Sequence, residues 1–342
     1  MTTSTEPIKW LLVGAGDIAG KRVGPALARA AGSHLVAVCN RSMERAQALG
    51  AKFGIEKGYT DLGEALAASG ANAVYVATPV DLHVPQAVAA LEAGKHVLVE
   101  KPLGLNAEQC GMAVAKAQRT GLVAGCAYYR RCYPCFRYTQ KMLNRGEFGK
   151  VIHVRMSYHA WFNPAREEPK YWRVVKSRSG GGPLFDMGSH MIDVMIGLPG
   201  MPRAVYGRVA TMTHPYEVED SAAVLMELEN GAEATASFHW NSKTWSHEFE
   251  IVGTEARLRW SPFDSGKLLK TVGRDTVEVN LPNAENVHQP LVEDFIQAVC
   301  QNREPVAPFV EAARTNLVLD AIYKSAQTGK EIRLTRRYQH RC

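Results

Sequence analysis

The sequence predicts a two-domain protein of mixed α/β and α+β class, in which a doubly wound parallel sheet precedes a domain built on antiparallel strands. Up to about residue 126, short apolar runs alternate with segments of helical periodicity, whereas from residue 151 onward apolar and polar residues alternate within the runs. The chain has 342 residues, more than one hydrophobic core usually organises. We therefore expect domains at residues 1–127 and 128–342.

The first strand–helix–strand unit lies near the N-terminus. Residues 8–13 form an apolar run typical of a buried parallel strand, and residues 34–39 form a second one. Between them, apolar residues at helical spacing predict a helix over 20–31. A glycine-rich segment, residues 14–19, joins the first strand to the helix, at the place where doubly wound folds bind dinucleotides.

This segment has the pattern G-x-G-x-x-A. Gly14 allows a tight turn, Gly16 lets a pyrophosphate approach the backbone, and Ala19 permits close packing of the helix on the strand. Alone, such a match is as often a structural turn as a binding site, but a strand before it and a helix after it favour a dinucleotide. The residues that we assign to the cofactor here are Gly14, Gly16, Asp17 and Ile18.

The end of the second strand bears on which dinucleotide binds. NAD enzymes usually carry a carboxylate there, but this chain has Asn40, Arg41 and Ser42, and no carboxylate before Glu44. A guanidinium and a hydroxyl bind a 2′-phosphate, which a carboxylate would repel. We therefore predict NADP(H) as the preferred cofactor. NAD(H) is the alternative if Arg41 is only a solvated residue at the start of a helix.

The next two strands end in polar residues. Apolar runs at 73–77 and 96–99 predict buried strands, and a helix over 85–93 with Gly94 behind it connects them. The carboxyl ends of such strands form the ligand-binding edge of the sheet. A lysine at a strand end is most often a surface residue, but Lys101 stands between apolar segments and beside a proline. The residues that we assign to the cofactor at this edge are Thr78, Pro79, His83, Glu100 and Lys101.

In the predicted second domain, a Gly-Gly-Gly-Pro sequence at 180–183 predicts a helix start before Asp186 and His190. On a helix, residues four apart share one face, so the carboxylate could orient the imidazole and raise its basicity, as a proton-transfer histidine requires. Asp193 is a further candidate for orienting the ring. Taken alone, such a pair is more often a hydrogen-bonded contact that only stabilises its helix.

Alternating apolar and polar runs follow in the C-terminal part of the chain. They predict half-buried antiparallel strands at 151–158, 223–228, 234–238 and 249–252. The Asn-Gly pair at 230–231 predicts a hairpin turn between the second and third of these strands. This region therefore differs in architecture from the N-terminal one.

Three blocks of the sequence, residues 77–83, 90–102 and 180–193, together resemble the glucose–fructose oxidoreductase/inositol dehydrogenase (Gfo/Idh/MocA) family. They occur in the order that the family has, and the resemblance extends from about residue 8 to residue 334. It implies an N-terminal Rossmann fold and a second domain with one large open, mainly antiparallel sheet. Because the free face of that sheet usually pairs with another subunit in the family, we expect a homodimer or a homotetramer.

The resemblance also implies the chemistry. In the family, the residues that match Lys101, Asp186 and His190 surround the reacting carbinol. His190 would be the general acid–base, Lys101 would hold the alkoxide-like oxygen by its charge, and Asp186 would orient His190 or the substrate. The substrate would be a sugar, a cyclitol or a related polyhydroxylated compound that reacts at a CH–OH group.

Aromatic and charged residues flank these positions and give the candidate substrate contacts. We expect them in a crevice between the domains, after the last Rossmann strand at 122–126 and within 158–173. Rings and polar groups together suit a sugar, although packing explains any single aromatic residue better. Besides Lys101, Asp186 and His190, the residues that we assign to the substrate are Tyr128, Arg130, Tyr158, Trp161 and Arg173.

Composition limits the partners and the compartment. The formal net charge is +6, but Lys and Arg are dispersed among acidic residues apart from a basic cluster at 336–341. No nucleic-acid motif accompanies that cluster, so we expect no nucleic-acid partner. The sequence shows neither the apolar stretch of a signal peptide nor a run of membrane length, which predicts a cytoplasmic protein without membrane association.

The cysteines predict neither disulfides nor a metal site. There are seven, an odd number without a disulfide pattern, which fits a reducing compartment. Cys132 and Cys135 form a C-x-x-C, but zinc would need further ligands at matching spacing. Thioredoxin-like chemistry would place the pair after the first strand instead. We therefore interpret both as packing cysteines and expect no metal.

Three classes of function remain open from the sequence. The first is an NAD(P)-dependent oxidoreductase that transfers hydride between a nicotinamide cofactor and a sugar or polyol. The second is an NAD-dependent glycoside hydrolase of the same broad fold, which the release of free sugar from nitrophenyl glycosides would reveal. The third is a non-catalytic, cofactor-binding redox sensor, against which the presence of Lys101, Asp186 and His190 argues.

Overall fold

The structure is a computed structural model that describes residues 6–334, so the basic cluster at 336–341 lies outside the described residues. Contacts divide the chain into two compact units. Among the described residues, unit 1 comprises 6–129 together with 284–313, and unit 2 comprises 130–283 and 314–334. This differs from the predicted division at residue 127, because 284–313 belong to the first unit.

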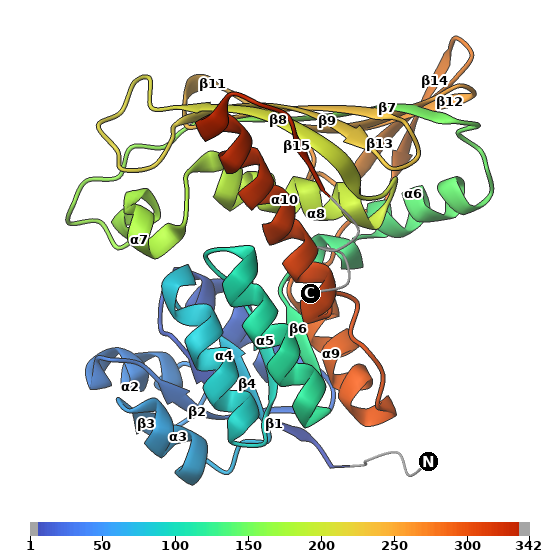
Figure 1. The fold of residues 1–342 in the computed structure, drawn as a ribbon. Helices are drawn as coiled ribbons and strands as arrows, with labels where there is room; N and C mark the ends of the chain where they lie inside the picture. The colour runs from blue at the N-terminus through green and yellow to red at the C-terminus, as the bar shows by residue number, and fades with distance from the viewer. Residues whose placement is uncertain (1–5, 335–342) are drawn as a thin grey trace. The chain divides into compact units, whose positions relative to one another are not determined.

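Unit 1 contains a parallel sheet whose strand order, β3-β2-β1-β4-β5-β6, is that of the Rossmann fold (Figure 1). The strands are β1 (Ile8–Val13), β2 (Ser33–Cys39), β3 (Gly58–Tyr59), β4 (Ala73–Val76), β5 (His96–Val99) and β6 (Ala124–Cys126). All neighbouring pairs are parallel. The order reverses between β1 and β4, which puts the glycine-rich segment after β1 at the usual ligand-binding position. The predicted doubly wound sheet is confirmed.

Helices cover both faces of this sheet, which explains why its strands are mainly apolar. On one face, buried side chains of β1, β4 and β5 pack against α3 (Leu62–Ala68), α4 (His83–Glu92) and α5 (Ala107–Thr120). Figure 1 shows α4 and α5 side by side in front of the strands. On the other face, Trp10 of β1 contacts Phe295 of α9 (Gln289–Gln301), with ring centroids 5.3 Å apart. This contact explains why residues 284–313 belong to unit 1.

The helix predicted over 20–31 is interrupted. It begins as a π-helix, η1 (Ala19–Val23), and continues as α1 (Gly24–Arg29). The N–H of Gly24 reaches back five residues to the carbonyl of Ala19, and Pro25, the next residue, has no N–H to donate. The helix therefore changes its hydrogen-bond register here and also ends earlier than predicted.

Unit 2 contains a large sheet in the order β14-β13-β12-β11-β7-β10-β9-β8-β15. The strands are β7 (Val151–Trp161), β8 (Pro202–Ala210), β9 (Ser221–Leu228), β10 (Glu233–His239), β11 (Asn241–Gly253), β12 (Ala256–Trp260), β13 (Lys267–Val272), β14 (Asp275–Asn280) and β15 (Ile332–Arg333). Its pairs are antiparallel except β7 with β10, which is parallel. The predicted open, mainly antiparallel sheet is confirmed.

Helices pack on one face of this sheet. Figure 1 shows α6 (Pro134–Asn144), α8 (Ser189–Gly197) and the later part of α10 (Phe309–Thr328) on the same side of the strands. In β10 every second side chain, as in Ala234 and Phe238, is buried toward the helices, whereas Thr235 and Ser237 on the opposite face are half-buried. We call this opposite side the open face of the sheet. The hairpin predicted at 230–231 joins β9 to β10, and Gly231 there has a φ of 82°.

Candidate active site

The glycine-rich turn after β1 has the geometry that a dinucleotide requires. Gly14 has a φ of 104°, and a Cβ at this residue would lie 2.5 Å from the carbonyl oxygen of Ala77, so the fold itself requires glycine. Gly16 is different, because a Cβ there would meet no atom within 4 Å and its φ is not in the left-handed region. Packing does not explain glycine at position 16, whereas the close approach of a pyrophosphate to the backbone does.

The residues after Gly16 lead directly into a helix start. Ile18 is half-buried and precedes η1, and Ala19 is fully buried against the sheet as predicted. Asp17 is exposed, and its carboxylate pairs with the Lys21 ammonium at 2.7 Å. The first backbone N–H groups of a helix have no partner within the helix and attract phosphate. The turn and the helix start together fit the diphosphate of NAD or NADP.

The segment at the end of β2 presents a cation rather than a carboxylate. The side chain of Asn40 accepts a hydrogen bond from the Ser42 N–H at 3.0 Å. Ser42 in turn caps α2 (Met43–Ala51) by accepting the Arg45 N–H at 3.3 Å. Arg41 lies between these two fixed residues with its side chain exposed. Its guanidinium is thus accessible from solvent.

The loops after β4 and β5 are joined by His83. Its ring is buried, with Nδ1 at 2.8 Å from the carbonyl oxygen of Pro102 and Nε2 at 2.9 Å from that of Thr78. Burial lowers the pKa of His83, and the two hydrogen bonds offset part of this effect. Thr78 also donates its hydroxyl to Gln86 at 2.7 Å, and Pro79 precedes a 3₁₀ turn. His83 therefore holds two strand-end loops together, a structural role that we did not predict.

Lys101 lies where the sequence predicts it, two residues after the end of β5 at the carboxyl edge of the sheet. The side chain of Lys101 is half-buried, whereas that of Glu100 before it is only 7% exposed. Unit 1 thus combines a turn that fits a dinucleotide with a lysine at the same edge of the sheet.

Asp186 and His190 lie on two different kinds of helix, not on one α-helix as predicted. Asp186 is in a π-helix, η5 (Leu184–Gly188), and His190 is in α8, which follows at once. In a π-helical turn hydrogen bonds span five residues, so a spacing of four does not by itself align two side chains. His190 is 3% exposed. The carboxylate of Asp186 lies 4.0 Å from the guanidinium Nε of Arg173.

Two further predicted substrate residues gather near Asp186 in unit 2. The guanidinium of Arg173 stacks over the ring of Trp172 at 4.7 Å from its centroid. Burial, together with the negative charges of Asp186 and Asp264, raises the pKa of Tyr158 to about 12, and the nearby charge of Arg130 opposes this. The structure therefore brings together Tyr158, Arg173 and Asp186.

Two other predicted substrate residues are buried and make contacts within the protein. Tyr128 is fully buried in the core of unit 1. Arg130 is 3% exposed and forms a bidentate ion pair with Asp264, with distances of 2.7 and 2.6 Å. We therefore leave both out of the proposed substrate contacts. Trp161 at the end of β7 is 45% exposed and contacts the ring of His214 edge to face, so it remains a candidate.

The buried carboxylate of Glu219 holds the glycine segment before Asp186, and the sequence did not predict this contact. Glu219 accepts hydrogen bonds from the Gly182 N–H at 2.9 Å and from the Tyr323 hydroxyl at 2.8 Å. Burial raises the pKa of Glu219, and these bonds offset part of the effect. A Cβ on Gly182 would overlap the backbone of Glu219, which explains the glycine. Gly182, Glu219 and Tyr323 are too far apart in sequence for a local pattern to predict these hydrogen bonds.

Asp193, a candidate for orienting His190, forms a buried ion pair with Arg131. Its carboxylate accepts hydrogen bonds from the Arg131 guanidinium at 2.8–3.1 Å, and the two side chains are 1% and 7% exposed. Removing one partner of a buried pair leaves an uncompensated charge. We therefore expect Asp193→Asn to lower the free energy of unfolding by about 3–5 kcal/mol in urea denaturation followed by tryptophan fluorescence.

The exposed ion pair between Lys267 and Glu278, at 3.0 Å, supplies the control for this prediction. Both side chains are about half exposed, so Glu278→Gln should change stability little. If Asp193→Asn is as stable as Glu278→Gln, the buried ion pair does not stabilise unit 2.

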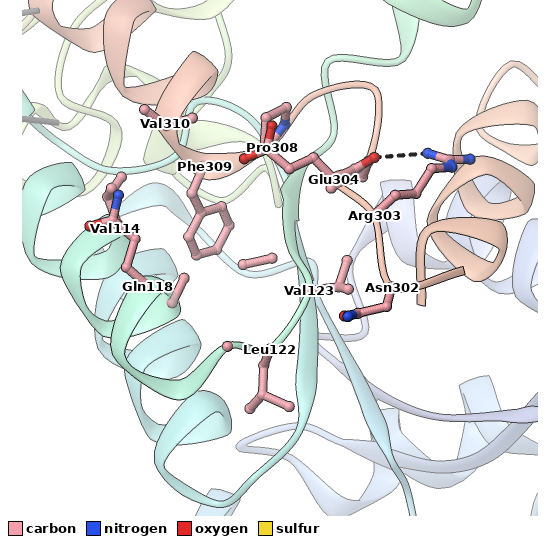
Figure 2. Close-up of a pocket in the computed structure, with 14 residues that line it drawn as sticks. Val114, Gln118, Leu122, Val123, Asn302, Arg303, Glu304, Pro308, Phe309 and Val310 are labelled. Atoms are coloured by element: carbon pink, nitrogen blue, oxygen red, sulfur yellow. Dashed lines mark hydrogen bonds between the residues drawn. The ribbon is translucent and has the colours of Figure 1, made fainter. Parts of the chain in front are cut away.

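Unit 1 also contains a hollow. Its volume is about 260 Å³, and it lies at the amino end of β6, between the end of α5 and the loop that leads into α10 (Figure 2). The lining is mainly apolar, with Leu122, Val123 and Phe309 among its residues. Ligands of Rossmann folds bind at the carboxyl ends of the strands, so we do not include this hollow in the site.

The two cysteines of the C-x-x-C sequence lie in unit 2. Cys132 and Cys135 are both buried and are not joined in a disulfide, and burial raises the pKa of the Cys135 thiol to about 11. Among residues 6–334, no group of three or more His, Cys, Asp and Glu side chains is arranged to hold a metal ion. In the same residues, no helix combines the length and the apolar character needed to cross a membrane.

Taken together, the sheet order, the glycine turn and the lysine at the carboxyl edge define a dinucleotide-binding protein of the Rossmann class. Comparison with known proteins agrees. Residues 8–128 match the oxidoreductase family with an NAD-binding Rossmann fold, Gfo/Idh/MocA, and residues 136–259 match the Gfo/Idh/MocA C-terminal domain. The chain belongs to the Gfo/Idh/MocA family of oxidoreductases, which confirms the resemblance found in the sequence.

Relatives cover nearly the full length of the chain. It is 30% identical to a 1,5-anhydro-D-fructose reductase of Ensifer adhaerens, over 94% of this chain and 97% of the relative. It is 26% identical to a D-glucoside 3-dehydrogenase of Escherichia coli strain K12, over 98% and 99%. The structure of a levoglucosan dehydrogenase in complex with NADH and L-sorbose has the same fold, with a TM-score of 0.86, 23% identity, and coverage of 97% of this chain and 100% of that one.

Proposed function

We propose that this protein transfers hydride between a nicotinamide cofactor and a CH–OH or carbonyl group of a sugar, cyclitol or related polyhydroxylated compound. The observation that carries the proposal is Lys101 at the carboxyl edge of a sheet whose glycine turn fits a dinucleotide. A lysine in this position puts a positive charge where the reactive end of the cofactor is expected. The family to which the chain belongs supports the reaction type.

In this proposal each residue has a distinct task. Lys101 holds the substrate oxygen and stabilises the negative charge that develops on it. His190 takes the hydroxyl proton during oxidation and returns it during reduction. Asp186 orients His190 or a substrate hydroxyl, and Arg173, whose Nε lies 4.0 Å from the Asp186 carboxylate, helps to hold that carboxylate in place. The nicotinamide, when bound, supplies or accepts the hydride.

The substrate class is inferred from two lines of support. The relatives named above carry the names of enzymes that act on a fructose derivative and on glucosides. In unit 2, Tyr158, Trp161 and Arg173 offer aromatic faces and hydrogen-bond donors, which suit the apolar faces and hydroxylated edges of a pyranose. A screen of sugars and polyols with NAD⁺ and with NADP⁺, followed at the absorbance of the reduced nicotinamide, tests the proposal.

The same screen separates the other two functions. Release of nitrophenol from nitrophenyl glycosides, with no net reduction of cofactor, would favour the glycoside hydrolase. Tight binding of NADH or NADPH without turnover of any sugar or polyol would favour the sensor. Reduction of cofactor that depends on one group of sugars supports the oxidoreductase.

We propose NADP(H) as the preferred cofactor, because Arg41 is exposed directly after β2. Arg41→Asp replaces a phosphate-binding cation with the carboxylate that NAD enzymes carry there. The ratio of the dissociation constants for NADPH and NADH, measured by fluorescence titration, should shift toward NADH by about tenfold or more.

Arg29→Asp is a control for this variant, since Arg29 is an exposed residue at the end of α1 and the charge change is identical. It should leave the ratio unchanged. An equal shift in both variants would mean a general charge effect, and no shift in Arg41→Asp would mean that the 2′ position is not recognised at this loop.

We also propose a homodimer or a homotetramer formed through the open face of the sheet in unit 2. The face carries adjacent exposed apolar side chains, since Tyr206 pairs with Leu225 across β8 and β9, and these are 48% and 50% exposed. Light scattering coupled to size-exclusion chromatography tests this state, and a monomer at micromolar concentration would contradict it.

A further inference from the structure

The carboxylate of Glu100, next to Lys101, is held from several sides inside unit 1. Its Oε1 accepts a hydrogen bond from the Tyr75 hydroxyl at 2.9 Å and lies 3.1 Å from Nε2 of His288. Its Oε2 accepts the backbone N–H of Lys101 at 3.3 Å. Tyr75, Glu100 and His288 are 0%, 7% and 1% exposed. A carboxylate this deeply buried needs such partners to stay ionised.

The partners decide the charge of Glu100. Burial alone would raise its pKa, but the hydrogen bond and charge of His288, the charge of Lys101 and the hydrogen bond of Tyr75 outweigh burial and lower it. Because the ionised Glu100 carboxylate can only accept a hydrogen bond, we assign a ring proton to Nε2 of His288, which donates it to Glu100. Glu100 is therefore a carboxylate beside the Lys101 ammonium.

His288 is itself fixed in place. It precedes α9, and its backbone N–H donates to the side chain of Asn286 at 3.1 Å. Asn286 donates to the carbonyl of Arg22 in η1 at 2.8 Å, which ties this segment to the helix after the glycine turn. The ring of Tyr129 lies against the His288 ring, with centroids 4.7 Å apart. These contacts fix the position from which the His288 imidazole reaches Glu100.

We infer that His288 is a positioning residue for Lys101. With Tyr75 it holds the Glu100 carboxylate, and Glu100 fixes the backbone of Lys101 and sets a negative charge beside it. The inference rests on the proposed function, in which Lys101 holds the reacting oxygen. His288 acts through Glu100 and not by contact with the substrate. Without its donor, the carboxylate turns away from its present position and Lys101 loses its alignment.

The test compares two substitutions of similar size. His288→Gln keeps an amide N–H that can reach Glu100, whereas His288→Leu fills the space without a donor. Because misplacement of a catalytic group by about 1 Å can cost about 10²-fold, we expect His288→Leu to lower kcat by about 10- to 100-fold. His288→Gln should stay within about threefold of the wild type, since it restores the donor. Neither should change the dissociation constant for NADH or NADPH, because the bond from Asn286 to Arg22 is intact.

A second variant keeps the inference testable if His288→Leu does not fold. Tyr75→Phe removes only the other side-chain donor to Glu100 and should lower kcat several-fold with unchanged cofactor binding. A wild-type kcat in both His288→Leu and Tyr75→Phe would overturn the inference, and so would equal losses in His288→Gln and His288→Leu, which would indicate packing alone. If instead Lys101→Ala keeps its activity, the proposed function fails, whatever the His288 variants show.

Discussion

Lys101→Ala is expected to lower kcat by about three orders of magnitude or more while cofactor binding stays nearly unchanged. The reason is the position of Lys101 after the carboxyl end of β5, where in the proposed function its ammonium stabilises charge that develops on the substrate oxygen only as hydride moves. An interaction made mainly in the transition state affects kcat more than it affects binding. Steady-state rates and fluorescence titration with NADH and NADPH give the two quantities.

Lys95→Ala is the matched control, because Lys95 lies just before the amino end of the same strand. It should retain wild-type activity. A loss in Lys101→Ala of less than about tenfold, which corresponds to about 1.4 kcal/mol, would mean that Lys101 is not catalytic.

His190→Asn should abolish most activity and remove the near-neutral limb of the pH–rate profile. Imidazole is the side chain whose ordinary pKa, about 6.5, lies closest to neutrality, so it is suited to exchanging a proton in that range. During oxidation the substrate hydroxyl loses a proton, a neutral His190 is required, and the rate should rise with pH. During reduction His190 must be protonated, so the rate should fall as pH rises through the same range.

Asp186→Asn should leave a residual rate, because the imidazole remains and only its orienting charge is lost. His34→Asn, an exposed residue of β2, should leave the profile unchanged. The profiles must be recorded where a deuterium isotope effect shows that hydride transfer limits the rate. A flat wild-type profile in both directions would assign the proton to another group, with Lys101 as the next candidate.

Much of unit 1 could be predicted from the sequence because its strands are buried on both faces and bounded by clear breaks. The predicted strands at 8–13 and 96–99 coincide with β1 and β5. The placement of 284–313 could not be predicted, because α9 is an ordinary amphipathic helix and its partner Trp10 lies far away in sequence. The parallel pairing of β7 with β10 could not be predicted from the sequence either, since an alternating strand has the same pattern in either orientation.

In the site too, short motifs could be predicted from the sequence, whereas contacts between remote segments could not. Gly14 and Lys101 are set by short motifs, and the structure has them at the predicted edge of the sheet. The surroundings of the site residues depend on side chains from remote segments. Asp264 pairs with Arg130 across 134 residues, and His288 reaches Glu100 across 188. No spacing rule connects residues so far apart, so these contacts appear only once the fold is known.

The most direct test of the central claim is transfer of deuterium from a substrate carbinol to the cofactor. Sugars and polyols deuterated at their carbinol carbons would be incubated with the enzyme and with NAD⁺ or NADP⁺, and the reduced cofactor analysed by mass spectrometry. The proposed function predicts deuterium on the nicotinamide ring with at least one sugar or polyol, and a loss of that transfer in Lys101→Ala. Absence of transfer from every compound with both cofactors, or transfer that is unaffected in Lys101→Ala, would contradict it.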